Sequence, residues 1–245
     1  MKGQLRSELL KQRSTRTTPA LLAALLGLVV LAVLLHGFDL PAADLAKRDN
    51  QLTIFGRGEF LGALFGALLG AMAFTGEVRH GTIRPTFLVS PWRGRVVAAK
   101  VAVCALIGAV FGLIASALAA AIGTVVLRGR GIDVQLDGGD YALLVGGGAA
   151  ASALWAAIGV GIGAIVPDQV PTLIGISAGL LFVEGLFGGD LDDVSKFAPG
   201  TLGMAISGQE PDKLLAPVLR FLLLALYALA LTAAGWLATS RGDVA

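Results

Sequence analysis

Several residue types that build common functional sites are scarce in this sequence. The chain has a single cysteine, Cys104, so no disulfide can form within it. Its two histidines, His36 and His80, are far apart in the sequence and have no cysteine nearby, so a metal site is not expected. The chain also has no G-x-x-x-x-G-K-[ST] loop, the usual cradle for ATP phosphates, and we expect it to bind no cofactor itself.

Charged residues are also few. They make up 15% of the 245 residues, whereas soluble domains have about 25%. The net charge of +2 is too small to suggest a nucleic-acid partner. Hydrophobic residues account for 56% of the chain. This composition is typical of an integral membrane protein.

Long apolar runs give the expected fold class. A run of about 20 apolar residues is long enough to cross a bilayer as a helix, and helices satisfy their own backbone groups in lipid. We therefore expect an all-α membrane protein with one transmembrane domain, 19–245, and six transmembrane helices. The six runs are 19–36, 58–74, 96–127, 141–166, 170–187 and 214–238, and the third is long enough to tilt or to project from the bilayer.

The N-terminal segment 1–18 precedes the first run. Leu5, Leu9 and Leu10 fall on one side of a helix that is otherwise surrounded by cations, which favours an amphipathic helix lying on the membrane surface. A solvated basic tail is the alternative. The segment also resembles a secretory signal, but no small-x-small cleavage site follows, so we favour an uncleaved first span.

The distribution of basic residues predicts the orientation. If both termini are cytoplasmic, eleven of the nineteen lysines and arginines lie on the cytoplasmic side, including the two densest clusters. The segment 75–95, TGEVRHGTIRPTFLVSPWRGR, is then cytoplasmic.

The segment 75–95 has the features of a short helix between two spans. Gly76 and Gly81 punctuate it, and Pro85 fits only a first helical turn. Ser90 and Pro91 look like the N-cap and first residue of the third span, which places Trp92 at the membrane interface. From these residues alone, a docking element for a partner and a loop that only determines topology are equally supported.

Three segments resemble the type-2 ABC exporter permease family. They are SELLKQRSTRTT near the N-terminus, GEVRHGTIRPTFLVSPWRGRVVAAK, and FVEGLFG with the later FAPGTLGMAISG. The resemblance implies a type V exporter fold with an N-terminal elbow helix, a coupling helix between spans 2 and 3, and a re-entrant segment between spans 5 and 6. It also implies two permease chains and two ATPase chains, with ATP and Mg bound by the ATPase subunits. The coupling-helix residues that bind the ATPase would be Glu77, Arg79, His80, Gly81, Thr82, Ile83, Arg84 and Phe87.

Rows of glycine mark surfaces where helices can approach closely. Such rows are used in membrane helix packing. They lie at Gly58, Gly62, Gly66 and Gly70 in the second run and at Gly175 and Gly179 in the fifth. In this family the second and fifth spans meet across the dimer and line the pathway. Packing within one chain is an equally supported alternative.

Two charges lie inside apolar runs. Charged residues at membrane depth are candidates for function, and Glu184 and Arg220 have similar predicted depths, so we expect them to face each other or a shared cavity. Arg220 reaching the headgroups is the alternative. The loop 188–213 is too short to span and too apolar to be fully solvated, which suggests a re-entrant helix.

Two further motifs are not assigned a function. The turn VPDQVP carries Asp168, where many members of the family have a basic residue, so a second ATPase contact at this turn stays an open question. The match of GISAG to G-x-S-x-G lies within an apolar helix, and we interpret Ser177 as a packing residue.

The sequence therefore favours a permease subunit of an ATP-driven exporter in the plasma (inner) membrane, without enzymatic activity of its own. The expected substrate is amphipathic or hydrophobic, and the expected partners are an ATPase subunit, a second and identical permease chain, and the bilayer. The alternative is a membrane scaffold or sensor that recruits a soluble cytoplasmic partner.

Overall fold

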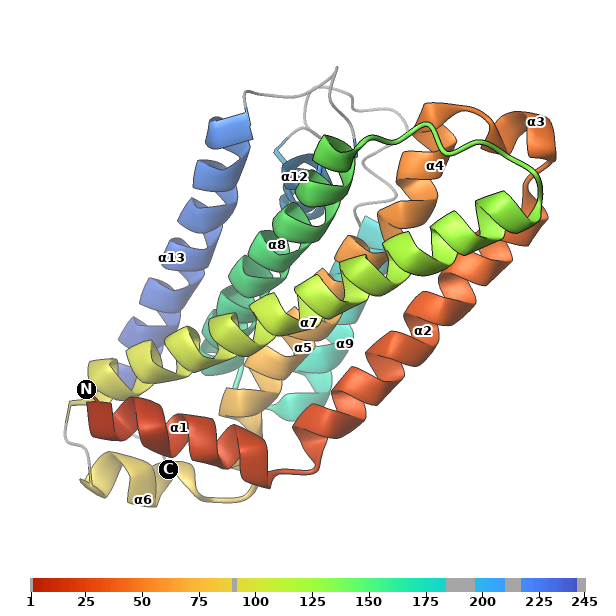
Figure 1. Ribbon diagram of the computed structural model, residues 1–245. Helices are drawn as coiled ribbons and strands as arrows, with labels where there is room; N and C mark the ends of the chain where they lie inside the picture. The colour runs from red at the N-terminus through yellow and green to blue at the C-terminus, as the bar shows by residue number, and fades with distance from the viewer. Residues whose placement is uncertain (1, 90–91, 184–196, 210–216, 242–245) are drawn as a thin grey trace.

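The computed structural model describes residues 2–89, 92–183, 197–209 and 217–241 (Figure 1). Within these ranges every regular element is helical, which confirms the all-α class for the described part of the chain. The helices are α1 (Lys2–Ser14), α2 (Thr17–Asp39), α3 (Ala42–Leu45), α4 (Arg48–Phe55), α5 (Arg57–Arg79), α6 (Ile83–Val89), α7 (Arg93–Gly129), α8 (Gly138–Ile165), α9 (Gln169–Ala178), the π-helix η1 (Gly179–Val183), α12 (Pro199–Ile206) and α13 (Pro217–Arg241).

Five helices of the described chain are long and apolar enough to cross a membrane. They are Thr17–Asp39, Arg48–Arg79, Arg93–Gly129, Gly138–Ile165 and Val218–Ser240, and they correspond to the first, second, third, fourth and sixth predicted runs. The fifth run is represented by the shorter apolar helix Gln169–Leu181, and the last four residues of that run, 184–187, lie outside the described residues. A sixth span therefore stays a prediction.

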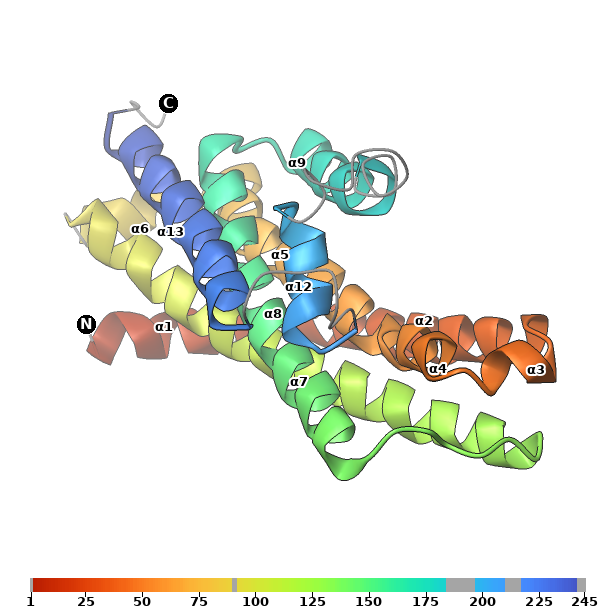
Figure 2. The same cartoon turned by 90° about the horizontal axis from the view of Figure 1, so that it is seen from above.

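The third run forms the longest helix, as predicted. Helix α7 has 37 residues, which corresponds to about 55 Å and exceeds the roughly 30 Å hydrocarbon core. It begins at Arg93, close to the predicted start, while the proposed cap at Ser90 and Pro91 lies outside the described residues. Figure 2 shows α7 extending beyond α8 toward α3, on the side where α2 also runs.

Helix α5 lies at the centre of the bundle, packed on α7 and α8. Its glycines allow this close approach. A Cβ atom at Gly58 would lie 2.5 Å from the carbonyl oxygen of Ala115 in α7, and one at Gly66 would lie 2.7 Å from that of Ser152 in α8. Gly62 and Gly70 face the same two helices. The glycine row of the second run thus packs within the chain, which is the second of the two alternatives, because its faces are already covered by α7 and α8.

Helices α2 and α13 flank this centre. The inward face of α2 repeats every four residues, with Leu25, Val29 and Val33 fully buried. Helix α13 packs on α8 where Gly161 faces Leu231 and Gly235 faces Ala164. The outward faces of both helices carry exposed leucines, as expected for surfaces in contact with lipid.

Polar contacts hold the connections at the α12 end of the bundle. Asp137 caps α8 by accepting a hydrogen bond from the Asp140 N–H at 2.9 Å, and the Asp140 carboxylate accepts one from the Asp137 N–H at 3.0 Å. Arg48 donates to Asp140 at 2.6 Å, which joins α4 to the start of α8. The opposite end of the bundle, which carries α1, α6 and the last turn of α13, is called the α6 end below (Figure 1).

Because α5 and α8 pack so closely, we expect a single methyl group added between them to lower the stability of the protein. In a Gly70→Ala variant the new Cβ would overlap the carbonyl oxygen of Ala156, so α5 and α8 must separate. We expect a loss of about 1–3 kcal/mol in stability, measured by denaturant unfolding in detergent micelles. Gly27→Ala in α2 is the matched control, because nothing lies within 4 Å of a Cβ there. Equal stability of the two variants would contradict this packing.

Candidate functional site

Four charged side chains, three of them largely buried, meet at the α6 end. Lys100 of α7 is 1% exposed and donates hydrogen bonds to Glu8 of α1 at 2.8 Å and to Glu77 of α5 at 2.5 Å. Lys11 of α1 donates to the same two carboxylates, at 2.8 Å each. These residues, Glu8, Lys11, Glu77 and Lys100, are called the ion cluster below. It has two positive and two negative charges and joins three helices.

Lys11 also connects the ion cluster to α6. Its ammonium group lies 3.5 Å from the hydroxyl oxygen of Thr86, within hydrogen-bonding distance. Partial burial lowers the pKa of Lys11, but hydrogen bonds to Glu77 and Glu8 outweigh this effect and leave the pKa above its ordinary value of 10.5. Lys11 is therefore charged throughout the physiological range.

A tight turn connects α5 to α6. The Thr82 N–H donates to the Glu77 carbonyl at 2.9 Å and the Gly81 N–H donates to the Val78 carbonyl at 3.0 Å, which is the Schellman pattern of a helix C-terminus. Gly81 has φ +67°, a conformation that favours glycine at this position. The turn thus aims α6 away from the axis of α5.

Among the side chains of α6 that the structure describes, Ile83 is buried and Leu88 is exposed. Ile83 is 3% exposed and packs with Phe74, Val97 and Ala164. Leu88 is 84% exposed, and Trp92 just beyond the helix is 66% exposed. Leu88 and Trp92 thus leave apolar surface uncovered at the α6 end.

The predicted coupling residues divide into two groups. Glu77 belongs to α5 and pairs with Lys11 of α1 and Lys100 of α7. Ile83 is buried and packs α6 against the bundle. Binding of an ATPase by either residue stays a prediction. The exposed group comprises Arg79, His80, Gly81 and Thr82. Arg84 and Phe87 lie within α6, and their side chains are outside the described part of the structure.

Two of the exposed residues have partners within the chain. Arg79 donates to the side-chain oxygen of Gln169 at 3.1 Å, so the start of α9 lies beside the end of α5. His80 Nδ1 lies 2.7 Å from the Gly76 carbonyl oxygen. Since a carbonyl only accepts, Nδ1 carries the proton in this contact.

A second buried polar group lies under α12. Arg220 of α13 is 5% exposed and donates to the Ala205 carbonyl of α12 at 3.2 Å. Glu59 of α5 is 2% exposed and accepts a hydrogen bond from Gln209 at 3.1 Å. Arg220 therefore does not extend to the surface, and Glu184, its predicted partner, lies outside the described residues.

The two glycines of the fifth run, Gly175 and Gly179, both face open space. Nothing lies within 4 Å of a Cβ placed at Gly175 or Gly179.

In the described parts of the chain no three His, Cys, Asp or Glu side chains gather in a way that suits a metal ion. His36 instead lies 2.7 Å from the guanidinium of Arg57.

Sequence reasoning did not single out Glu8, Lys100 or Glu59. Lys100 is the only charged residue in the apolar run 96–127, and Glu8 is the only acid in an N-terminal helix rich in cations. Both are signals of a buried pair. The sequence could not show that Lys100 pairs with Glu8, because 92 residues separate the two.

No protein-family model matches this chain, and no curated protein matches it. Its function is therefore inferred from its residues and their geometry.

The ion cluster predicts a strong dependence of stability on Lys100. In Lys100→Met two carboxylates lose a buried partner, and we expect a loss of about 3–5 kcal/mol, measured by denaturant unfolding in micelles. Lys47→Met is the control: Lys47 pairs with Asp44 at 2.8 Å on the surface, and its removal should barely change stability. The double variant Lys100→Met/Glu8→Gln should recover part of the loss. Additive losses would contradict coupling within the cluster.

Lys11 predicts a specific pH dependence. Because its folded-state pKa is raised, its stabilisation is complete at neutral pH and is lost only as pH rises through that pKa, above 10.5. The difference in unfolding midpoint between the wild type and Lys11→Met should therefore stay constant from about pH 7 to about pH 10 and shrink at higher pH. Lys2→Met, which changes an exposed lysine of the same helix, should show no such difference. A difference that shrinks near neutral pH would refute this assignment.

Proposed function

We propose that this chain is the permease subunit of an ATP-driven ABC exporter of the type-2 family. Two features support the proposal together: the family-like segments near residues 7–18, 76–100 and 182–208, and five helices suited to crossing a membrane. The observation that carries it is α6, a separate short helix attached to the ends of α5 and α7 with Leu88 and Trp92 exposed.

In this proposal α6 is the coupling helix and α1 is the elbow helix. The α6 end is cytoplasmic, both termini lie on that side, and the chain resides in the plasma (inner) membrane. Helix α1 supports this role, because Leu5 and Leu9 are half-buried, Leu10 is 56% exposed, and Glu8 faces the bundle. The leucines then contact lipid while Glu8 anchors α1 to α7.

The ion cluster explains how movement would pass from α6 to the spans. ATP binding and hydrolysis in the partner subunits, which hold ATP and Mg, shift α6. Ile83 packs against α5, α7 and α8, and Thr86 meets Lys11 of the cluster. Glu77 and Lys100 belong to the ends of α5 and α7. A movement of α6 would therefore shift the ends of α5 and α7 together, because separating these ends would break the cluster and expose buried charges.

The finer architecture of the proposal has six spans and a dimer. The run 170–187 is the fifth span, and the segment 188–213, which includes α12, is re-entrant. Open space at Gly175 and Gly179, with Val170 59% exposed, suits contact of α9 with a second and identical permease chain. Apolar surfaces favour an amphipathic or hydrophobic substrate.

The exposed face of α6 gives the test. Leu88→Ser should weaken copurification of the chain with the ABC ATPase subunit about tenfold, because it removes a leucine that is 84% exposed on the docking face. Leu143→Ser, at a 55% exposed leucine near the opposite end of the bundle, is the control. ATP hydrolysis by the complex should fall in parallel.

The same experiment separates a permease from a scaffold or sensor. A chain that functions in cells without any ATPase, and whose Leu88→Ser variant loses a different soluble protein, would refute the exporter assignment.

A further inference from the structure

Helix α1 carries a row of cations on its outward face. Its one acid, Glu8, is buried and belongs to the ion cluster, so it faces the bundle. Lys2, Arg6 and Arg13 fall within about 40° of one another on the side opposite Glu8, because successive residues of a helix are about 100° apart. All three side chains are exposed. The charges on the outward face of α1 are therefore all positive.

Leucines border this row on both sides. Leu9 is half-buried and lies on one side of the row, and Leu10, which is 56% exposed, lies on the other. Lysine and arginine next to apolar side chains at a membrane surface extend their charged ends to the lipid headgroups while the apolar side chains contact hydrocarbon. The outward face of α1 thus combines the two kinds of side chain that contact the surface of a bilayer.

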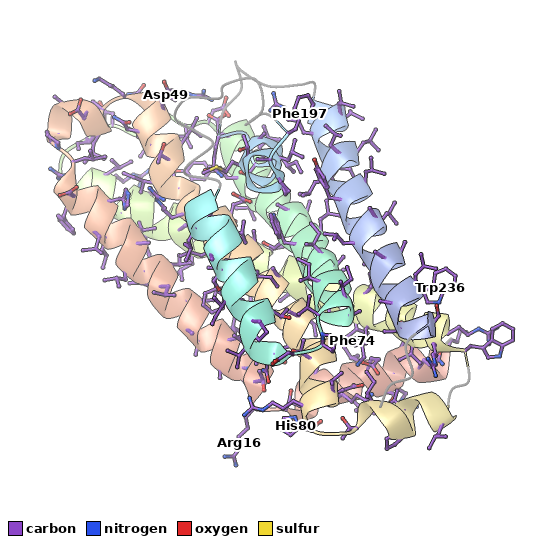
Figure 3. All side chains as sticks on the ribbon, turned by 180° about the vertical axis from the view of Figure 1, so that it is seen from behind. Arg16, Asp49, Phe74, His80, Phe197 and Trp236 are labelled. Carbon is purple, nitrogen blue, oxygen red and sulfur yellow. The ribbon has the colours of Figure 1, made fainter. Side chains whose placement is uncertain are left out.

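The connection between α1 and α2 keeps this face close to the membrane surface. Helix α1 ends at Ser14, and α2, which is long and apolar enough to cross a membrane, begins at Thr17. Two residues extend at most about 7 Å, so α1 stays near the level at which the span begins. Figure 1 shows α1 crossing the α6 end of the bundle at an angle to α2, and Figure 3 shows Arg16 of the connection at the same end.

Four exposed cations of this segment have no anionic partner among the described residues. They are Lys2, Arg6, Arg13 and Arg16, called the α1 cations below. The ion pairs of the described chain join other lysines and arginines, namely Lys11, Lys47, Arg48 and Lys100. Because four like charges lie along one short segment, they attract an anion from outside the described chain.

We propose that the α1 cations bind anionic phospholipids of the surrounding membrane. Two observations together select this occupant. The face has four positive charges and no exposed acid, and the two-residue connection holds it at the level of the headgroups, where lipid phosphates are the abundant anions. The binding surface is independent of the proposed export function, because it requires neither ATP nor an ATPase.

The test measures which lipids surround α1 in the full-length chain. In Gly3→Cys a bimane label is attached to an exposed residue of α1, where nothing lies within 4 Å of a Cβ, while Cys104 is buried and escapes labelling. In nanodiscs, brominated phosphatidylglycerol should quench the label with about tenfold greater apparent affinity than brominated phosphatidylcholine. Salt of about 0.5 M should reduce this preference, since the cations are exposed. Equal quenching by the two lipids would overturn the proposal.

A pair of double variants locates the binding surface. Arg6→Gln/Arg13→Gln should lower the preference for phosphatidylglycerol about fivefold, because each cation near the surface adds to the attraction. Lys47→Gln/Arg128→Gln is the control, since it removes the same charge from exposed residues at the α12 end and should leave the preference unchanged. Equal preferences in the two double variants would contradict binding at α1.

A second pair keeps the test decisive if the first variant does not fold. Lys2→Gln/Arg16→Gln removes the other two α1 cations and should cause a similar loss of preference. Copurification distinguishes lipid from protein as the occupant. A variant that loses the preference for phosphatidylglycerol but still copurifies with the ABC ATPase subunit supports the proposal. A variant that keeps the lipid preference but loses a protein partner would overturn it.

Discussion

The pairing of Lys100 with Glu8 and Glu77 is the interaction on which the α6 end depends. A lysine that is 1% exposed inside an apolar helix has a large desolvation cost, and it is retained only where carboxylates approach it closely. Glu8 and Glu77 come from α1 and α5, so the requirement to neutralise one buried ammonium group determines where both helices lie.

Close packing in the bundle makes this pairing geometrically possible. Glycines such as Gly66 bring the backbone of α5 against α8, and Gly58 brings it against α7, so that Glu77 reaches Lys100 at 2.5 Å. Small residues and buried charges therefore act together. The glycines remove the side-chain volume between helices, and the ion cluster stabilises the one arrangement in which the charges meet.

Lys11 connects parts of the structure that are far apart in the sequence. It belongs to the ion cluster, it lies next to Thr86 of α6, and it lines a cavity between α1 and the end of α5.

The sequence by itself determined the helical membrane class, the ends of most apolar helices, and a separate short helix after Gly81. These follow from local patterns, because runs of apolar residues, prolines and glycines act on their own segment of the chain. The tertiary structure decided that Ile83 attaches α6 to the bundle, that the glycine row of α5 packs on α7 and α8, and that Lys100 meets Glu8 and Glu77. These contacts join residues far apart in the chain, and a periodic pattern shows which face of a helix is buried without showing what covers it.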